Sequence, residues 1–398
     1  MRYIGTKHWL SPLVRSALLS VTDQGPVADV FAGMASVASA VSDARPVIAN
    51  DVMSFTAFCS EARLVDVGIP ASFDLLSETK RVFSEHRARL RTRFARRLAG
   101  EGAALRAARG PFRSWLETAP HAGSSSHYRK LADAAARAAQ WDRWQLATLY
   151  FSGGYFSTAQ AIDLDALRCA IDSTASGAQH TRLIAAWLES AAAIINAPGH
   201  SAQYLKPTTV QVASRIKRQW ARDVWDEFGN QLRTIERAGT RSSRNRVTTM
   251  DALEFLGSTL SREVRGVYAD PPYTRHDYSR YYHVYETLLR YDYPVSVGAG
   301  RYRSPRRTSD FSRASRVSWA FNELSRRVAE LQIPLIISYP DNGLLCQRGL
   351  RPETILLHHF RSVSRVRLRT AHSSLAGGPH STKESTEWLL IARPQGRS

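Results

Sequence analysis

The strongest constraint on the fold is the placement of short apolar runs, which gather near the two ends of the chain. They lie at residues 27–31, 46–49, 266–269, 334–338, 353–357 and 387–392. Each run is bounded by Gly, Pro, Asp or Asn, as expected of strands that are buried on both faces of a parallel sheet. Helical patterns at 36–44 and 54–67 separate the first of them, so the sequence predicts an α/β layer sandwich built from both ends of the chain.

The middle of the chain has a different pattern, in which Ala, Arg and Leu recur at helical spacing and strand signals are scarce. Segment 181–195 is the clearest example, since its apolar residues are three and four apart and Ala-Pro-Gly follows at 197–199. We therefore predict a mostly helical insertion that splits an α/β domain. The predicted domain segments are residues 1–74, 75–260 and 261–398, and the second of them is the insertion.

Charge narrows the choice of partner. The 398 residues include 54 Lys and Arg against 35 Asp and Glu, which gives a formal net charge of +19. A positive field of this size gathers a polyanion, so it favours a nucleic acid partner over the substrate of a typical small-metabolite enzyme. Basic residues concentrate at 80–109 and 301–316, where we predict phosphate contacts, with a solvated helix face and a surface loop as the alternatives. The predicted DNA-binding residues are Arg87, Arg89, Arg91, Arg93, Arg303, Arg306 and Arg307.

Other classes of protein receive little support. Cys59, Cys169 and Cys346 lie far apart and lack the spacing of a metal site or a redox pair. His358 and His359 lie in an apolar run, where a core position is favoured over metal binding. No stretch approaches the roughly 20 apolar residues of a membrane span, and no signal-peptide core follows the first residues. We expect a soluble, cytoplasmic protein with no metal and no membrane partner.

Two turns near the N-terminal end are candidates for binding a nucleoside cofactor. Asp29 lies in the first predicted strand, and Gly33 permits a tight turn through which the backbone can approach a ligand closely. The three spaced glycines of a dinucleotide fingerprint are absent, which disfavours NAD. The next strand runs into Asn50 and Asp51, where a carboxylate can accept hydrogen bonds from both hydroxyls of a ribose. A helix N-cap is an alternative, and compatible, role for Asp51.

The most specific motif is the Asp-Pro-Pro-Tyr of residues 270–273, which directly follows the predicted strand 266–269. Asp270 therefore stands at the carboxyl end of a buried strand, where α/β sheets place their chemistry. The two prolines hold the next turn in a rigid, extended shape. Asp-Pro-Pro alone occurs in structural turns, whereas the four-residue motif after a buried strand indicates a catalytic site.

In this order the segments resemble the S-adenosylmethionine-dependent DNA adenine-N6 methyltransferases of the Dam-like group, in particular the methylases of type IIS restriction-modification systems. In that group the cofactor motifs come first, then a recognition insertion, then the catalytic motif. Residues 2–7 resemble its N-terminal cofactor motif and residues 29–36 its glycine turn, although Ala35 stands where a second glycine is common. Further similar segments are residues 150–172, 199–206 and 278–286.

The resemblance implies a Rossmann-like methyltransferase sheet with a large, mostly helical inserted domain that recognises DNA. It implies methyl transfer from S-adenosyl-L-methionine to adenine N6 in duplex DNA, with base flipping, in a restriction-modification system. The implied catalytic residues are Asp270, Pro271, Pro272 and Tyr273. The implied cofactor-binding residues are Tyr3, Lys7, Asp29, Phe31, Gly33, Asp51 and Asp270. For Phe31, an ordinary core position is equally open.

Alternatives remain for the acceptor and for the activity. One is transfer to cytosine N4 or to an RNA base, and another is a DNA-binding subunit whose methylase core is vestigial. The expected partners are duplex DNA and a cognate restriction endonuclease. A monomer is expected, because a methylase that acts on one strand needs no symmetry.

Overall fold

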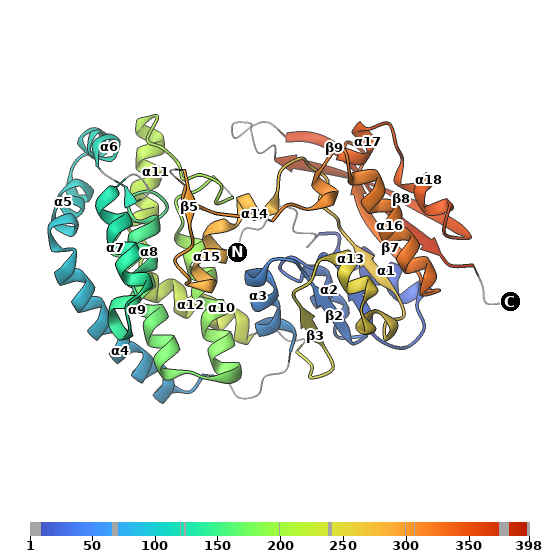
Figure 1. Cartoon of the computed structure of the whole chain (residues 1–398), viewed down its shortest axis with the longest axis horizontal. Coiled ribbons are helices and arrows are strands. Elements are labelled where there is room, and N and C mark those ends of the chain that lie inside the picture. Colours follow the sequence, from blue (N-terminus) through green and yellow to red (C-terminus); the bar gives the residue numbers. More distant parts are fainter. Residues whose placement is uncertain are drawn as a thin grey trace. The chain divides into compact units, whose positions relative to one another are not determined.

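The structure is a computed structural model that describes residues 9–65, 71–119, 121–122, 125–198, 200–237, 241–298, 300–305, 307–373 and 382–395. It divides into two compact units, each assembled from separate stretches of the chain (Figure 1). The described residues of the helical unit fall within 67–239 and 279–306. Those of the sheet unit fall within 5–66, 240–278 and 307–398.

A seven-stranded sheet forms the centre of the described part of the sheet unit, in the order β3-β2-β1-β4-β7-β9-β8. The strands are β1 (Val27–Asp29), β2 (Val47–Asn50), β3 (Arg246–Thr248), β4 (Val267–Ala269), β7 (Leu335–Pro340), β8 (Ser362–Ser373) and β9 (Thr382–Arg393). The first five strands in this order run parallel, whereas β9 is antiparallel to β7 and β8 is antiparallel to β9. The predicted α/β class with a mostly parallel sheet is therefore confirmed.

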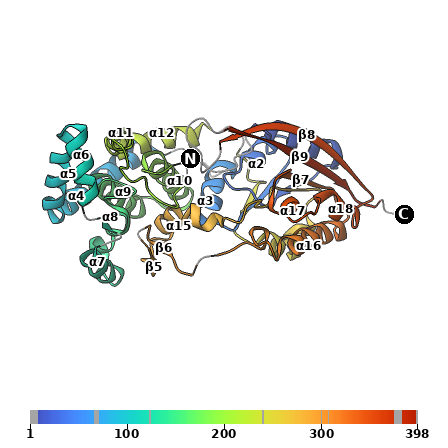
Figure 2. The same ribbon diagram turned by 90° about the horizontal axis from the view of Figure 1, so that it is seen from above.

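Helices cover both faces of this sheet. They are α1 (Ser11–Val21), α2 (Ser36–Val41), α3 (Ser54–Leu64), α13 (Ala252–Gly257), α16 (Val317–Glu330), α17 (Leu344–Gln347) and α18 (Pro352–Leu357). One apolar cluster joins the strands to α13, α16, α17 and α18, and a second joins them to α1 and α2. Figure 2 shows α2 and α16 on opposite sides of the strands. Because both faces are covered, β1, β4 and β7 are buried throughout, which explains their continuous apolar sequences.

One predicted strand is wrong, and two strands of the seven-stranded sheet were missed. Residues 353–357 form most of α18, which begins at Pro352, a residue well suited to the first position of a helix. A short apolar run does not distinguish a buried strand from a buried helix, which is why the pattern misled. The missed strands β3 and β8 lie at the two ends of the strand order, where partly exposed or exposed residues leave no apolar run.

The helical unit contains the middle of the chain together with the segment after the Asp-Pro-Pro-Tyr motif. Its helices are α4 (Phe73–Arg93), α5 (Ala95–Arg106), α6 (Arg109–Thr118), α7 (Ser126–Ala136), α8 (Leu146–Phe151), α9 (Thr158–Thr174), α10 (Gly177–Ile194), α11 (Val210–Trp220), α12 (Val224–Glu236), α14 (Tyr278–Tyr281) and α15 (His283–Arg290). A two-stranded hairpin, β5 (Ser296–Val297) and β6 (Tyr302–Arg303), follows α15. The helix predicted over 181–195 is confirmed as α10. No helix of the described part of the chain is long and apolar enough to span a membrane.

The units do not have the same limits as the predicted segments. Residues 246–257 were assigned to the insertion, but they form β3 and α13 in the sheet unit. The physical reason is pairing and burial, since β3 continues the sheet beside β2 and α13 joins the apolar cluster of one sheet face. Residues 279–306 were assigned to the C-terminal segment, but they belong to the helical unit.

Candidate active site

The sheet brings three predicted site carboxylates to one edge. Strands β2, β1 and β4 are neighbours and run parallel, so their carboxyl ends point the same way. Asp29 ends β1, Asp51 directly follows β2, and Asp270 directly follows β4. Asp51 and Asp270 are both close enough to act electrostatically on Asp29. The arrangement is that of a ligand site outside the carboxyl ends of the strands of an α/β sheet.

Asp29 is buried with unused hydrogen-bonding capacity. Its side chain is 3% exposed, and its Oδ1 atom has no hydrogen-bond partner among the described residues. Burial raises the pKa of Asp29 well above its ordinary value, the charge of Asp270 adds to this, and a hydrogen bond from the backbone N–H of Phe31 opposes it. A buried acceptor without a donor is costly, and a ligand with an N–H group or a positive charge relieves that cost.

Asp51 holds the glycine turn in place. Its Oδ2 accepts a hydrogen bond from the N–H of Gly33 and its Oδ1 accepts one from the N–H of Met53, both at 2.8 Å. Gly33 has φ +51° and Ala35 has φ +58°, the left-handed conformation that glycine adopts most easily. At Ala35 this costs about 1 kcal/mol. The alternative role of Asp51 as a helix N-cap is wrong, because α3 begins after Met53 and has no side-chain cap.

The catalytic turn predicted at residues 270–273 is anchored at one end. Tyr273 packs against the apolar cluster around α16, and its carbonyl accepts a hydrogen bond of 2.8 Å from the N–H of Leu344. Pro271 is buried, whereas Asp270, Pro272 and Tyr273 are partly exposed. The turn therefore combines a backbone fixed at Tyr273 with side chains that, apart from that of Pro271, are partly exposed.

Two further residues complete the surroundings. The ring of Phe31 packs edge-on to that of Phe311, with the centroids 5.2 Å apart, and it contacts the same apolar cluster.

Tyr268 is a further residue of this region, and the sequence did not lead us to predict it. It is buried, and burial with the charges of Asp270 and Asp29 raises the pKa of its phenol. The signal was present, because residues two apart on a strand share a face and Tyr268 precedes Asp270 by two. Tyr3, Lys7 and Arg306 lie outside the described residues.

Two arginines predicted to bind DNA are engaged in ion pairs within the protein. Arg87 donates two hydrogen bonds, of 2.7 and 3.1 Å, to the buried carboxylate of Asp163. Arg303 makes two bonds of 2.7 Å to Asp292. These two guanidinium groups are neutralised by carboxylates, so they are poorly placed to bind phosphate.

The other predicted arginines are more accessible. Arg93 lies 3.3 Å from a carboxylate oxygen of Asp142, and the Arg89 guanidinium lies 4.5 Å from the centroid of the Trp141 ring. Arg91 and Arg307 are exposed. The run 87–93 is thus divided between internal partners and solvent, a difference that its sequence does not reveal.

Comparison with known proteins points to the same class of protein as the Asp270–Tyr273 motif. Residues 227–329, which include the Asp270–Tyr273 turn, match the D12 class N6 adenine-specific DNA methyltransferase family. The chain is 24% identical over 355 residues to Modification methylase LlaI of Lactococcus lactis subsp. lactis, a match that covers 87% of this chain and 47% of that protein. It is 27% identical over 213 residues to Type II methyltransferase M.FokI of Planomicrobium okeanokoites, covering 52% of this chain and 29% of that protein.

The predicted resemblance to adenine-N6 DNA methyltransferases is therefore confirmed. The matches span about half or less of the length of these two relatives.

Proposed function

We propose that this chain is a site-specific DNA methyltransferase that transfers a methyl group from S-adenosyl-L-methionine to the N6 amino group of adenine in duplex DNA. It acts as a monomer in a restriction-modification system, beside a cognate endonuclease. Its sheet unit is a Rossmann-like methyltransferase domain, and its helical unit contains the inserted target-recognition domain. One observation carries the proposal: the Asp270–Tyr273 turn lies in the segment that matches the family and adjoins the carboxylates at the ends of β1 and β2.

The residues present fit S-adenosylmethionine. The buried Oδ1 of Asp29 lacks a donor among the described residues, and it suits the amino group of the methionine part. The Asp51 carboxylate directly follows β2, beside Asp29, and its oxygens suit the ribose hydroxyls as hydrogen-bond acceptors. Gly33 adds no side chain at the turn. The bound cofactor supplies an electrophilic methyl group, and these residues hold and orient it.

The residues that we propose hold the adenine must make its amino group reactive toward the methyl group. The adenine amino group is a poor nucleophile because its lone pair is delocalised into the ring. In our proposal the Asp270 carboxylate and the Pro271 carbonyl accept hydrogen bonds from its two N–H groups and point the nitrogen at the methyl group. Because the turn is fixed at Tyr273, alignment alone supplies several kcal/mol of the rate enhancement, on the order of what positioned reactants gain.

Tyr273 supports the flipped base. A base in a duplex is out of reach, so it must be swung out at a cost of a few kcal/mol. Stacking on an aromatic ring returns roughly 1–3 kcal/mol. Tyr273 is partly exposed beside Asp270, which makes its ring available for this role.

The test is nucleoside-resolved mass spectrometry of DNA and RNA after incubation with the protein and S-adenosylmethionine. N6-methyladenine in duplex DNA is the expected product. Detection of N4-methylcytosine, or of a methylated base in RNA, would instead identify cytosine N4 or that RNA base as the methyl acceptor. Absence of both product and calorimetric cofactor binding would point to a vestigial methylase core.

A further inference from the structure

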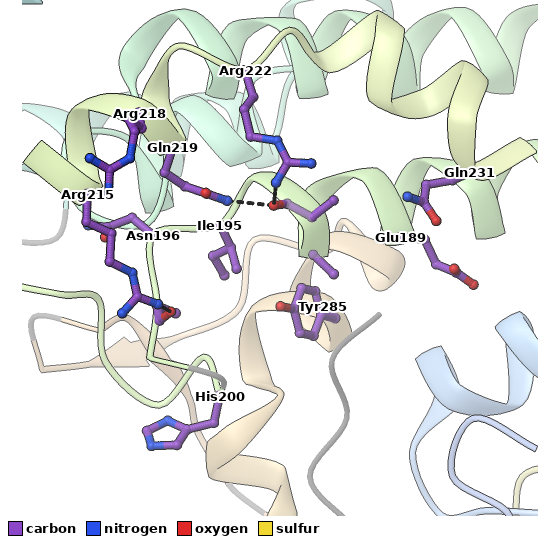
Figure 3. Close-up of a pocket in the computed structure, with 13 residues that line it drawn as sticks. Glu189, Ile195, Asn196, His200, Arg215, Arg218, Gln219, Arg222, Gln231 and Tyr285 are labelled. Carbon is purple, nitrogen blue, oxygen red and sulfur yellow. Dashed lines mark hydrogen bonds between the residues drawn. The ribbon is translucent and has the colours of Figure 1, made fainter. Parts of the chain in front are cut away.

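A cavity of about 750 Å³ lies within the helical unit, between the end of α10 and helices α11, α12 and α15 (Figure 3). We refer to it as the α11 cavity. Arg215, Arg218 and Arg222 line it, and the carboxylate in its wall is that of Glu189. The other titratable side chains of the lining are His200 and Tyr285. Arginine charge therefore exceeds carboxylate charge in this wall by two.

The amphipathic pattern of α11 explains why the arginines face the cavity. Its apolar side chains Ala213, Ile216 and Trp220 pack in a cluster with Phe112 and Leu116 of α6. Arg215 and Arg218 lie three residues apart on α11 and therefore share one side of the helix, and Arg222 lies in the turn that follows α11. Figure 3 shows all three arginine side chains at the cavity. Residues 206–222 contain five Lys or Arg and no Asp or Glu.

These arginines differ in how far the protein already uses them. Arg218 is exposed and makes no hydrogen bond or ion pair with any residue that the structure describes. Arg215 is exposed and makes one long bond, of 3.5 Å, to the Ala197 carbonyl. Arg222 bonds to the Ala193 carbonyl and pairs with Glu227, so it also braces the end of α10. Arg215 and Arg218 are therefore the two that remain available to a ligand.

A second observation points to a polar ligand. Asn196 lines the cavity and is 3% exposed. Its Nδ2 donates to the carbonyls of Gly154 and Leu205, which fixes the amide, while its Oδ1 has no hydrogen-bond partner among the described residues. The cavity thus offers arginine donors and one buried acceptor whose bond is not made within the protein.

We propose that the α11 cavity binds the phosphate backbone of duplex DNA, with Arg215 and Arg218 as the principal contacts. This assignment rests on the proposed function and names the part of the helical unit that holds the substrate. At a rise of 1.5 Å per residue Arg215 and Arg218 lie about 4.5 Å apart along α11, and a DNA strand carries one phosphate per roughly 3.4 Å of helix axis. The two arginines are therefore spaced to contact neighbouring phosphates of one strand. Each guanidinium can donate two hydrogen bonds to the oxygens of one phosphate, and the Asn196 Oδ1 accepts a hydrogen bond from a water molecule that hydrates the strand.

The test measures the affinity of the full chain for a labelled 20-base-pair duplex by fluorescence anisotropy between 50 and 200 mM salt. The key variant is Arg215→Ala/Arg218→Ala. The slope of log affinity against log salt is expected to fall by about 2, because each lost phosphate contact removes roughly 0.9. The matched control Arg81→Ala/Arg113→Ala removes the same charge from the same unit, at arginines paired with glutamates on their own helices, and it should keep the slope.

Two further variants distinguish the loss of a DNA contact from misfolding of the protein. Arg218→Ala alone removes no contact with a described residue and should lower the slope by about 1, while Arg215→Lys/Arg218→Lys should restore most of it. An unchanged slope in the Ala variants, or an equal fall in the control, would overturn the assignment. The proposed function is judged separately, by methyladenine formation in the wild-type protein. If the wild type methylates adenine but the Ala variants keep the salt slope, only the proposed DNA site is wrong. If the Ala variants lose slope but the wild type forms no methyladenine, only the proposed activity is wrong.

Discussion

Two buried aspartates, one in each unit, show how differently the protein uses buried charge. In the helical unit, Asp165 accepts hydrogen bonds from the N–H of Ala147 at 2.7 Å, the N–H of Thr148 at 2.8 Å and the Thr148 hydroxyl at 2.7 Å. The Tyr291 hydroxyl adds another. In the sheet unit, Asp29 is equally buried, but its Oδ1 has no donor among the described residues.

The difference separates a structural carboxylate from the carboxylate that we propose binds the cofactor. Burial raises the pKa of Asp165 to about 6, and its four donors limit that rise. They belong to the first turn of α8 and to Tyr291, so Asp165 ties separate segments together. Burial and Asp270 raise the pKa of Asp29 well above its ordinary value, and no comparable set of donors opposes them. Unused hydrogen-bonding capacity, and not burial alone, therefore marks the candidate site.

The largest effect is expected on the rate of methyl transfer when Asp270, whose charge acts on Asp29, is replaced. Replacing Asp270 with Ala removes the acceptor that we propose orients the adenine amino group, and methyl transfer should fall by roughly 1000-fold or more. Incorporation of labelled methyl into duplex DNA measures the loss. Since Asp270 is partly exposed, the thermal unfolding midpoint should change little.

Asp43→Ala is the matched control, because it removes an exposed aspartate of the same unit that pairs with Arg15 at 3.1 Å. It should leave the transfer rate unchanged. Full activity in Asp270→Ala would remove the role assigned to this carboxylate.

Replacing Asp165 with Ala should instead unfold the protein more easily. Four donors lose a buried acceptor, so the free energy of unfolding is expected to fall by about 3 kcal/mol. Denaturant titration measures it. Asp133→Ala, at an exposed position on α7, is the control and should shift stability by less than about 0.5 kcal/mol. A loss at Asp165 as small as that of the control would show that its bonds are not structural.

Arginines can be compared in the same way within one run of sequence. Arg87→Ala strips the partner from Asp163, whose side chain is 8% exposed, and should cost about 1–2 kcal/mol because Arg87 itself is 37% exposed. Arg91→Ala should change stability by less than about 0.5 kcal/mol. Denaturant titration and the salt slope of DNA binding measure both variants. A slope reduced by about 1 in Arg87→Ala at unchanged stability would restore the original prediction of a phosphate contact.

The sequence predicted what depends on local patterns. Buried parallel strands have continuous apolar sequences, so β1, β2, β4 and β7 could be located, and their parallel order brings Asp29, Asp51 and Asp270 to one edge. Features that depend on distant partners could not be predicted. Asp163 lies 76 residues from Arg87, so the run of arginines gave no sign that one of them was neutralised.

The same limit applies to the two regions that now carry the proposals. The spacing of Arg215, Arg218 and Arg222 is visible in the sequence, but only the fold shows that the other face of α11 is covered by α6. Likewise, the position of Asp29 at a strand end was predictable, whereas the missing donor at its Oδ1 required the coordinates of its neighbours.

The smallest effect is expected in the pH dependence of stability that arises from Asp29. It is also the most direct test of the contrast between Asp29 and Asp165. Its pKa is raised in the folded protein from an unfolded value near 3.8, so the folded state keeps a proton that the unfolded state has lost. The associated stability is full below pH 3.8 and decreases as the pH rises through the folded pKa. Asn at this position cannot ionise. Asp29→Asn should therefore match the wild type near pH 4 and exceed it in stability at higher pH.

Cofactor binding connects this titration to function. A cationic group beside Asp29 favours the ionised carboxylate, so S-adenosylmethionine should stabilise the wild type more at pH 7 than at pH 4 and should release protons on binding, measured by calorimetry in two buffers. Asp29→Asn should lose both effects, whereas the exposed Asp43→Asn should keep them. Parallel pH curves for wild type and Asp29→Asn, with no proton release in either, would mean that Asp29 is a passive core residue and that the cofactor's positive charge lies elsewhere.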